Sequence, residues 1–220
     1  ATRQLYMSGN AVLKAARELR EQLAGVAAEL LEVEPERVEF EAEGVRERDG
    51  ERSIEFRKLL AACASVDVPW HVHSTYRAPK GVPWQAHESW RGRVFPDFTY
   101  GCHAADVEVD LDSGRTRVLR YVAAHDVGQA INPQSVEGQI EGAVAMGLGY
   151  ALSEEVVFRE GQNLTGTFAQ YLIPTAVEVP PIDPVVLESG EGMGPFNARG
   201  IGEPPIGPPA PAVAAAIHAA

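Results

Sequence analysis

A single carboxylate, Glu203, has the clearest setting for chemistry in this sequence. It lies in the stretch ARGIGEPPIGPPAP (198–211), where two glycines precede it and five prolines follow it. Glycines let a ligand approach the backbone, and Pro204 disfavours the helical region for the residue before it, so we expect Glu203 to be extended. A pocket carboxylate with few charged neighbours can serve as a general base. A lone loop glutamate is also often a solvated surface residue, so the residues alone leave both roles open.

Cysteine and histidine offer little further chemistry. Cys63 and Cys102 are too few and too far apart for a disulfide framework. We expect both to be small buried residues in a reducing compartment, which favours the cytoplasm. The sequence has no CxxC, HExxH or similar cluster, which argues against a metal held by protein side chains. His71 and His73 alternate on one predicted strand face, where plain polar positions are favoured over a metal site.

Composition limits the classes of partner. The chain has 220 residues, 45% of them hydrophobic, which is enough for one large domain or two small ones. Its 31 acidic and 19 basic residues give a net charge of −12, which disfavours nucleic acid or an anionic membrane as partner. No apolar run approaches the roughly 18 residues of a membrane span. The sequence opens without Met and stops within an apolar helical pattern, so we expect a fragment, a split subunit or a truncated gene product.

The pattern of apolar residues predicts an α+β fold with helices packed on antiparallel hairpins, in two lobes of about 1–95 and 96–220. Residues 79–96 are predicted as a loop and 156–196 as mostly extended. Ser8 or Asn10 is expected to cap the first helix, and Asn132, followed by Pro133, the third. The predicted helices are 8–31, 56–65, 132–155 and one starting at the prolines near 208; the predicted hairpins are 37–56 (turn at Asp49-Gly50) and 95–128 (turn at 112–114), with further strands at 68–78 and 183–189.

The third predicted helix is unusually rich in glycine. Each glycine in a helix interior costs about 1 kcal/mol relative to alanine. Such a helix lets a ligand or another backbone come close, or it reflects tight helix packing alone, and the sequence does not decide between these. The four glycines are Gly138, Gly142, Gly147 and Gly149.

Three segments together resemble one family. GPFNARGIGEPPIGPPAPAVAAAI (194–217) is similar to the C-terminal active-site segment of the molybdenum hydroxylases, which include xanthine dehydrogenase, aldehyde oxidoreductase and aerobic carbon monoxide dehydrogenase large subunits. TRQLYMSGNAV (2–12) resembles the family segment that contacts a pterin cofactor, and 131–155 resembles the family's glycine-rich helix. The segments occur in family order, and the resemblance covers essentially the whole chain. It implies the molybdopterin-binding fold of the C-terminal half of the large subunit.

The resemblance also implies a reaction. In the family, molybdenum is held by the dithiolene of a pterin rather than by side chains, and bacterial members commonly use the cytosine dinucleotide form. The residue matching Glu203 is the general base for hydroxylation of an electron-poor C–H carbon with water-derived oxygen, while a hydride passes to molybdenum. Substrates of the family include purines, aldehydes and N-heteroaromatics.

Cofactor contacts carry over position by position. The resemblance implies that the segment 2–12 contacts the pterin and pyrophosphate of the cofactor. It also implies that the backbone of the segment 194–217 approaches the pterin and the metal. Met146 occupies a position where several members have a glutamine that can bond the metal's oxo group or the pterin, so that bond is absent here or supplied elsewhere. Gln139 lies on the same helix side but is expected before the cofactor, and Arg3 could instead be a surface charge. The implied cofactor-binding residues are Thr2, Arg3, Gln4, Met146, Arg199, Gly200, Ile201 and Gly202.

The resemblance further implies partners. The missing N-terminal half of the subunit would complete the cofactor site, and iron–sulfur and FAD centres would lie on partner subunits or domains. The chain alone is therefore not expected to turn over substrate. The rival interpretation is a non-catalytic module that completes a subunit interface, with Glu203 idle. A conventional hydrolase is a more distant alternative, because no Ser or Cys nucleophile lies in an elbow-type motif.

Overall fold

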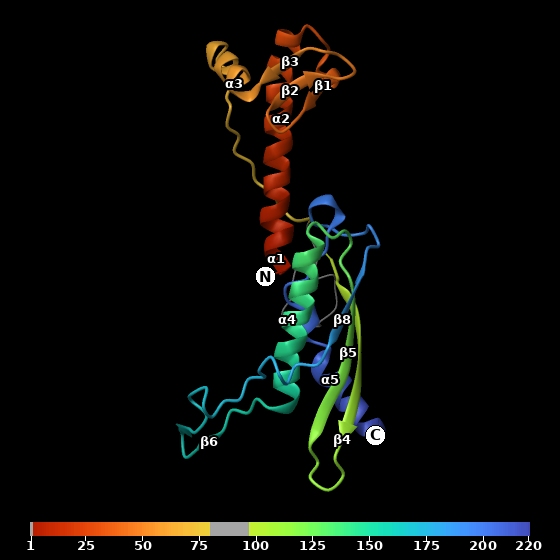
Figure 1. Cartoon of the computed structure of the whole chain (residues 1–220). Helices are drawn as coiled ribbons and strands as arrows, with labels where there is room; N and C mark the ends of the chain where they lie inside the picture. The colour runs from red at the N-terminus through yellow and green to blue at the C-terminus, as the bar shows by residue number, and fades with distance from the viewer. Residues whose placement is uncertain (1, 80–96) are drawn as a thin grey trace. The chain divides into compact units, whose positions relative to one another are not determined.

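The computed structural model describes residues 2–79 and 97–220 (Figure 1). It divides into two compact units, which are considered separately. One unit is Met7–Arg77, and the other combines the residues up to Tyr6 with the chain from Ala78 onward. The lobe boundary expected near residue 95, and nearly all of the predicted 79–96 loop, lie outside the described residues. Within the described ranges, no helix has both the length and the apolarity needed to cross a membrane.

The unit Met7–Arg77 contains two helices and a three-stranded antiparallel sheet of order β1-β2-β3. The short turn α1 (Thr2–Gln4) belongs to the other unit, and η1 (Leu5–Gly9) spans the boundary between the two. The elements that follow are α2 (Asn10–Leu31), η2 (Pro35–Arg37), β1 (Val38–Phe40), β2 (Gly44–Glu47), β3 (Ser53–Glu55) and α3 (Phe56–Ser65). The inner face of α2 and the buried residues of α3, Leu59 and Cys63, enclose one core with Val38 and Val45. The predicted hairpin with Asp49-Gly50 at its turn is confirmed as β2–β3.

Two predictions in this unit are wrong. Neither Ser8 nor Asn10 caps α2, because the chain enters α2 already coiled through the π-helical turn η1, and Gly9 has helical angles of φ −60° and ψ −45°. A helix that continues from a preceding turn needs no side-chain cap at that point. Residues 68–78 form no strand in the described chain: side-chain exposure alternates there, with His71 and His73 both exposed, but no neighbouring strand pairs with the segment.

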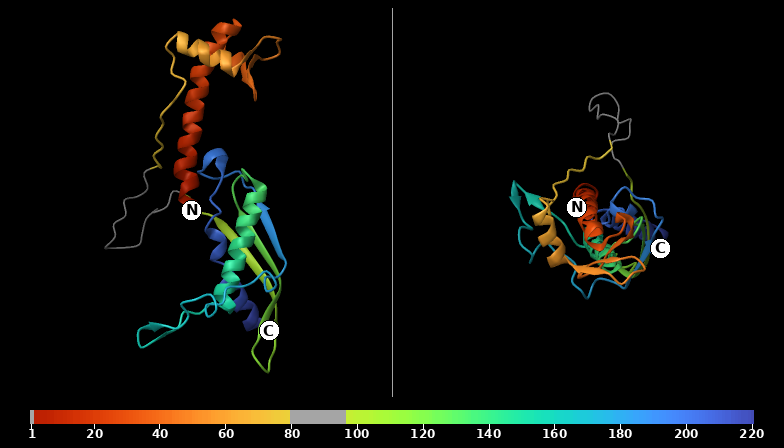
Figure 2. Two further views of the ribbon diagram at one scale, coloured as in Figure 1. Left: turned by 60° about the vertical axis from the view of Figure 1, so that its left-hand side comes forward. Right: turned by 90° about the horizontal axis from the view of Figure 1, so that it is seen from above.

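The other unit is built on a three-stranded sheet of order β4-β5-β8 (Figures 1 and 2). The long antiparallel pair β4–β5 confirms the predicted hairpin, with a bulge between Asp106 and Val107. The expectation of helices on antiparallel hairpins is confirmed, with the addition that β8 joins β5 in parallel. Pro184 is tolerated because β8 is an edge strand. The elements are β4 (Tyr100–Val109), β5 (Thr116–Asp126), α4 (Pro133–Leu152), β6 (Phe158–Arg159), β7 (Gln162–Asn163), β8 (Ile182–Leu187), η3 (Pro195–Asn197), η4 (Pro204–Ile206) and α5 (Pro209–Ala219).

Helices α4 and α5 cover one face of this sheet. Ile140, Val144 and Leu148, four residues apart on α4, share a core with the inward side chains of β5 and with Val213 of α5. Period-two alternation decides which strand residues join it: Ala105 and Val107 of β4 point inward. Cys102 has the opposite parity and is exposed, so the prediction that it is buried is wrong, whereas Cys63 is buried as predicted.

The N-terminus of α4 forms as its sequence predicts. The Asn132 side chain accepts a hydrogen bond from the backbone N–H of Ser135 (3.0 Å), and Pro133 occupies the first turn.

Two of the glycines of α4 allow close packing: a Cβ on Gly147 would lie 2.5 Å from Pro209 of α5, and one on Gly149 would lie 2.2 Å from Glu154. Added Cβ atoms at Gly138 and Gly142 would meet nothing within 4 Å.

The α4 glycines therefore divide into two classes with opposite responses to alanine. We expect Gly147→Ala to lower the free energy of unfolding by about 1–3 kcal/mol, because the added methyl overlaps Pro209. Gly138→Ala should raise it by up to about 1 kcal/mol, because alanine favours the helix and the space is open. Urea unfolding of the two variants beside the parent measures both. Equal effects of the two substitutions would contradict this division.

The side chains of His103, Tyr121 and His125 form a chain of contacts that joins β4 to β5 on the inner face of the sheet. The Tyr121 hydroxyl lies 2.9 Å from Nδ1 of His103, and Nε2 of His103 lies 2.7 Å from Nε2 of His125. Tyr121 is fully buried and His125 is 1% exposed. If Tyr121 donates to His103, then His103 donates to His125, and His125 carries its proton on Nδ1, which has no hydrogen-bond partner among the described residues. Gly101 makes room for this ring, because a Cβ there would lie 2.4 Å from it.

These histidines should make stability depend on pH. Burial lowers the pKa of His103 to about 4, with a smaller contribution from His125, and burial also lowers the pKa of His125. Between pH 6.5, the ordinary pKa, and about 4, the histidines are protonated in the unfolded chain but neutral in the folded chain. Their contribution to the free energy of unfolding is therefore fully present above pH 6.5 and is lost as the pH falls toward 4. The loss is on the order of 2–3 kcal/mol. Urea unfolding at several pH values measures it.

The carboxylates also titrate in this range, so variants must isolate the histidine contribution. His103→Gln should flatten the pH dependence, and His218→Gln, at an exposed position near the end of α5, should leave it unchanged. A profile for His103→Gln as steep as that of the parent would assign the pH dependence to the carboxylates instead.

Candidate functional site

The segment that carries Glu203 is hydrogen-bonded to residues just before β4 and just after β5. The backbone N–H of Arg199 donates to the carbonyl of Val127, just after β5, at 2.7 Å. The Thr99 hydroxyl, just before β4, donates to the carbonyl of Gly200 at 3.2 Å. The N–H of Gly200 in turn donates to the hydroxyl of Tyr6 at 3.3 Å. The loop is thus fixed to the sheet and to the N-terminal segment.

Arg199 anchors this loop through its side chain as well as its backbone. Its side chain is 8% exposed, and its guanidinium lies 3.2 Å from a carboxylate oxygen of Asp97 and 3.4 Å from one of Asp126. It also donates to the backbone carbonyl of Phe98. Two carboxylates at these distances compensate the buried charge, and loss of one partner of such a pair typically costs about 3–5 kcal/mol.

Asp126 is itself held by several donors. It accepts hydrogen bonds from the N–H of Gly128 (2.9 Å) and from the hydroxyl of Ser189 (2.9 Å). Burial acts to raise the pKa of the Asp126 carboxyl, but these hydrogen bonds and the positive charge of Arg199 outweigh it, so the pKa is lowered. Asp126 therefore acts as a structural turn residue that joins the end of β5 to the Arg199 loop.

A cleft of about 370 Å³ opens beside this loop. Thr2 lies on one side, and the stretch from Arg199 to Gly202 lies on another. The first turns of α4 complete the wall with Asn132, Ser135 and Gln139. Contact between the two ends of the chain is tight: a Cβ on Gly200 would lie 2.1 Å from the Thr2 side chain. Only glycine fits at this crossing.

Features of the cleft suit an anionic ligand. The side-chain oxygen of Thr2 is buried and makes no hydrogen bond within the part of the chain that the structure describes. A buried polar atom without a partner is rare in a finished site and indicates a missing ligand group or water. The 20-residue helix α4 begins at the cleft, and its N-terminus carries partial positive charge. No group of three or more His, Cys, Asp or Glu in residues 2–79 and 97–220 is placed to hold a metal ion.

Glu203 departs from its predicted conformation. Its angles, φ −121° and ψ −35°, are not extended, because the chain turns directly into the 3₁₀ turn η4. Its side chain is exposed in this chain, and Oε2 lies 3.4 Å from the backbone nitrogen of Thr2, which donates to it. The carboxylate is thus linked to the residue that borders the cleft, across 201 positions of sequence.

The remaining predicted cofactor residues fall into two groups. Ile201 lines the cleft with its neighbours Gly200 and Gly202. Arg3 and Gln4 are exposed and do not line it. Gln139, which sequence reasoning placed before the cofactor, lines the cleft; its position in the first two turns of the capped helix α4 was the available signal.

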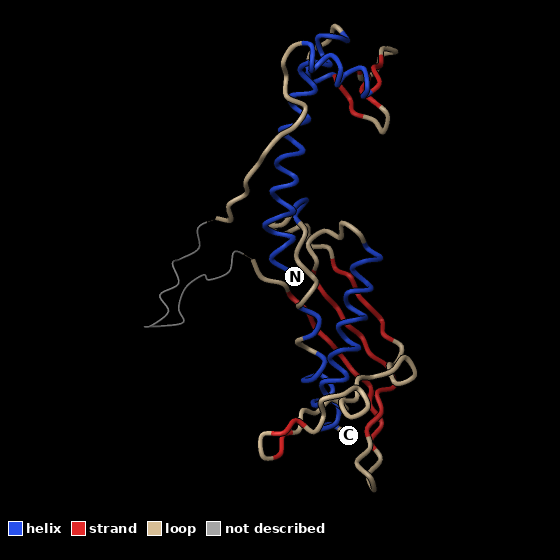
Figure 3. Tube along the Cα trace, turned by 90° about the vertical axis from the view of Figure 1, so that its left-hand side faces the viewer, coloured by secondary structure: helices blue, strands red, loops and turns tan. Residues whose placement is uncertain are grey.

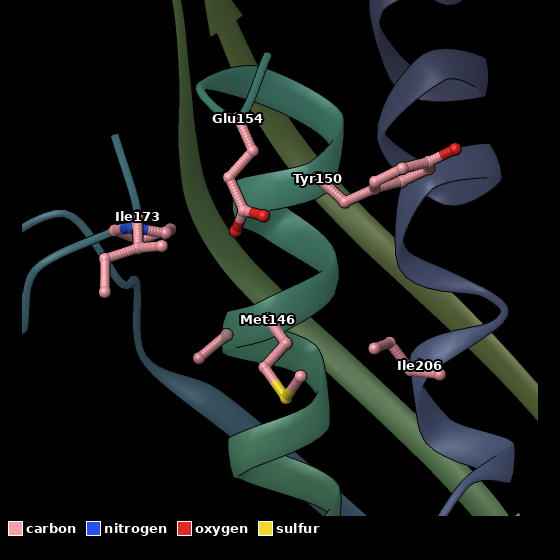
Figure 4. A pocket seen from close by; sticks show the side chains of 7 residues that line it. Met146, Tyr150, Glu154, Ile173 and Ile206 are labelled. Carbon is pink, nitrogen blue, oxygen red and sulfur yellow. The ribbon is translucent and has the colours of Figure 1, made fainter. Parts of the chain in front are cut away.

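Met146 lies at a second, apolar groove farther along α4. The groove has a volume of about 560 Å³, and its lining includes Met146, Tyr150 and Glu154, which follow one another along α4 (Figure 4). Ile206, three residues after Glu203, lies on the side of η4. The groove thus begins next to the loop of the candidate acid.

Comparison with known proteins agrees with this architecture. Residues 1–180 match the family described as "Molybdopterin cofactor-binding domain", so the chain belongs to that family. It is 32% identical over 219 residues to the gamma subunit of the 6-hydroxypseudooxynicotine dehydrogenase complex of Paenarthrobacter nicotinovorans, covering 99% of this chain and 27% of the relative. It is 31% identical to a probable hypoxanthine oxidase of Escherichia coli, covering 96% of this chain and 21% of the relative.

Solved structures show the same fold. Quinoline 2-oxidoreductase from Pseudomonas putida 86 superposes with a TM-score of 0.78 at 30% identity, covering 99% of this chain and 27% of that one. Aldehyde oxidoreductase from Desulfovibrio gigas gives a TM-score of 0.64 at 27% identity, over 75% of this chain and 17% of that one. The chain therefore spans about a quarter of the length of the relatives it matches.

The Thr2–Gly200 crossing can be tested directly. Gly200→Ala should push the N-terminal segment away from the cleft at a cost of about 2 kcal/mol, which corresponds to about 30-fold weaker retention of the pterin. Gly25→Ala is the matched control, because an added Cβ there meets nothing within 4 Å. Pterin and molybdenum content per chain after purification is the measurement. Full pterin content in Gly200→Ala would show that the crossing does not shape the binding site.

Proposed function

We propose that this chain is the part of a molybdenum hydroxylase large subunit that holds the pterin cofactor and supplies the catalytic base. The cleft between Thr2, the Gly200–Gly202 stretch and the start of α4 would hold the cofactor's anionic portion. The observation that carries this is the buried oxygen of Thr2, which has no hydrogen-bond partner among the described residues, in a cleft lined by all three segments that resemble the family. When bound, the cofactor would supply the two-electron oxidation of an electron-poor C–H carbon.

Glu203 is the residue that would move the proton. Oε2 accepts from the Thr2 N–H, and Oε1 is then available to take a proton from the water-derived nucleophile. The buried pairing of Arg199 with Asp97 and Asp126 fixes the backbone four residues before Glu203 and so orients the acid. Family membership and this fixed position support the general-base role over an idle surface residue.

The substrate is proposed to be an N-heteroaromatic compound. The names of similar proteins mention 6-hydroxypseudooxynicotine, nicotine, quinoline and hypoxanthine. Carbon atoms next to ring nitrogen are electron-poor, which suits attack by a water-derived nucleophile. Purines such as hypoxanthine fall within this class, and aldehydes are the alternative within the same chemistry.

Further components belong to the same proposal. The cofactor is proposed to be the cytosine dinucleotide form. Iron–sulfur and FAD centres on partner subunits or domains would carry electrons away from it, and the assembly would be cytoplasmic. The gamma-subunit designation of the Paenarthrobacter relative, within a named complex, supports a multi-subunit assembly.

Replacement of the acid separates catalysis from cofactor binding. In the assembly purified from its host, Glu203→Gln should retain molybdenum and pterin and lower turnover by about 10²–10⁴-fold, the usual contribution of a general base. Glu51→Gln, an exposed glutamate in the turn between β2 and β3, should keep both. The measurements are molybdenum per chain and the rate with an N-heteroaromatic substrate.

The alternatives give distinct results. Unchanged turnover in Glu203→Gln would show that Glu203 is idle. An intact, folded assembly with neither molybdenum nor pterin in the parent would favour the non-catalytic module.

A further inference from the structure

Apolar side chains remain exposed along α4 and the segment that follows it. No charged residue occurs between Glu141 and Glu154, so the second half of α4 is apolar on nearly every side. One side faces the sheet, while Met146 and Tyr150 on another side are 61% and 75% exposed. A helix that is apolar all round is buried in a finished protein. The segment that follows α4 adds exposed apolar side chains at Val156, Phe158, Leu164, Phe168, Leu172, Ile173 and Val177.

Together these side chains form what we call the α4 apolar surface: the groove residues Met146, Tyr150, Ile173, Pro174 and Ile206, with the apolar side chains of 156–177. In the same unit, 156–177 is mostly loop, and its small β6–β7 hairpin projects away from the sheet (Figures 1 and 3). An apolar groove accompanied by many exposed apolar side chains marks an interaction site.

Hydrogen bonds and close packing hold the segment 171–174 in place beside α4. The hydroxyl of Tyr171 donates to Oε2 of Glu154 at 2.5 Å, and the Ser153 hydroxyl donates to the carbonyl of Leu172 at 2.8 Å. Gly149 lets Pro174 cross α4 closely, since a Cβ there would lie 2.5 Å from the proline ring. The segment 171–174 is therefore fixed against the end of α4 and forms a wall of the groove.

Charge and chain length identify the occupant. The groove lining contains no cation, and its single charged group, Glu154, is engaged by Tyr171. An apolar partner is therefore favoured over an anionic one. The chain spans only 21–27% of the length of its relatives, so most of a large subunit lies outside it. We propose that the α4 apolar surface is the docking site for an apolar segment of the remaining part of the large subunit. This rests on the proposed role of the chain as part of such a subunit.

Cysteine reactivity tests the surface in the assembled subunit. The variants Tyr150→Cys, Phe168→Cys and, as control, Leu111→Cys are made in a Cys102→Ser background, which removes the exposed native thiol. Leu111 is 91% exposed at the β4–β5 turn and lies off the α4 apolar surface. Each variant reacts with a small maleimide in the assembly and again in denaturant. The ratio of the two rates gives a protection factor that does not require the chain to fold alone.

The expected result is protection of Tyr150→Cys and Phe168→Cys at least about tenfold greater than that of Leu111→Cys. Protection factors equal to that of Leu111→Cys would overturn the proposal. The experiment is run on assembly prepared without the pterin as well. Protection that persists there comes from polypeptide, whereas protection present only with the pterin means that cofactor or substrate fills the groove, and that outcome also overturns it.

A photo-crosslinking residue at position 150 identifies what covers the surface. Crosslinked peptides from the remaining part of the large subunit support the proposal. Crosslinks to a second copy of this chain, or to an iron–sulfur or flavin partner, overturn it. Failure of the proposed function would appear separately, as an assembly that protects Tyr150→Cys but contains no molybdenum.

Discussion

The buried charge of Arg199 is the constraint on which the candidate site depends. A guanidinium on a side chain that is 8% exposed must be compensated, and Asp97 and Asp126 approach it from just before β4 and from the end of β5. Because both carboxylates lie at the ends of adjacent strands, the sheet fixes the guanidinium, and the guanidinium fixes the backbone that leads to Glu203. Planar, multiply bonded arginine suits this role better than lysine would. The residue that sequence reasoning assigned to the cofactor through its backbone thus supports the site through its side chain.

The cleft is made from parts that contribute different properties. The stretch from Gly200 to Gly202 supplies backbone that a ligand can approach, and α4 supplies the positive end of a helix dipole. Thr2 supplies a buried hydroxyl oxygen that makes no hydrogen bond among the described residues. The acid follows Gly202 of the cleft wall directly and accepts a hydrogen bond from the backbone N–H of Thr2, and its side chain is exposed.

Much of the fold could be predicted from local signals. Asn132 and Pro133 defined the start of α4, and alternation defined the β4–β5 pair. The errors came where distant contacts decide. The exposure of residues 68–78 alternates as in a strand, but the segment has no partner strand among the described residues. Cys102 is exposed because it points to the face of β4 away from the core, whereas Ala105 points toward the core. The Arg199 pairing could not be inferred, because it joins residues about 100 positions apart, and Glu203 adopts angles set by the turn that follows it.

The contact of Thr2 with Gly200 also has a kinetic meaning. It joins residues that are far apart in sequence, so this contact can form only after the chain has been synthesised as far as Gly200. The unit Met7–Arg77, in contrast, closes its core through neighbours in sequence and can form early. The hydrogen bonds that join the N-terminal segment to Gly200 and Glu203 are therefore among the last contacts of this unit to form.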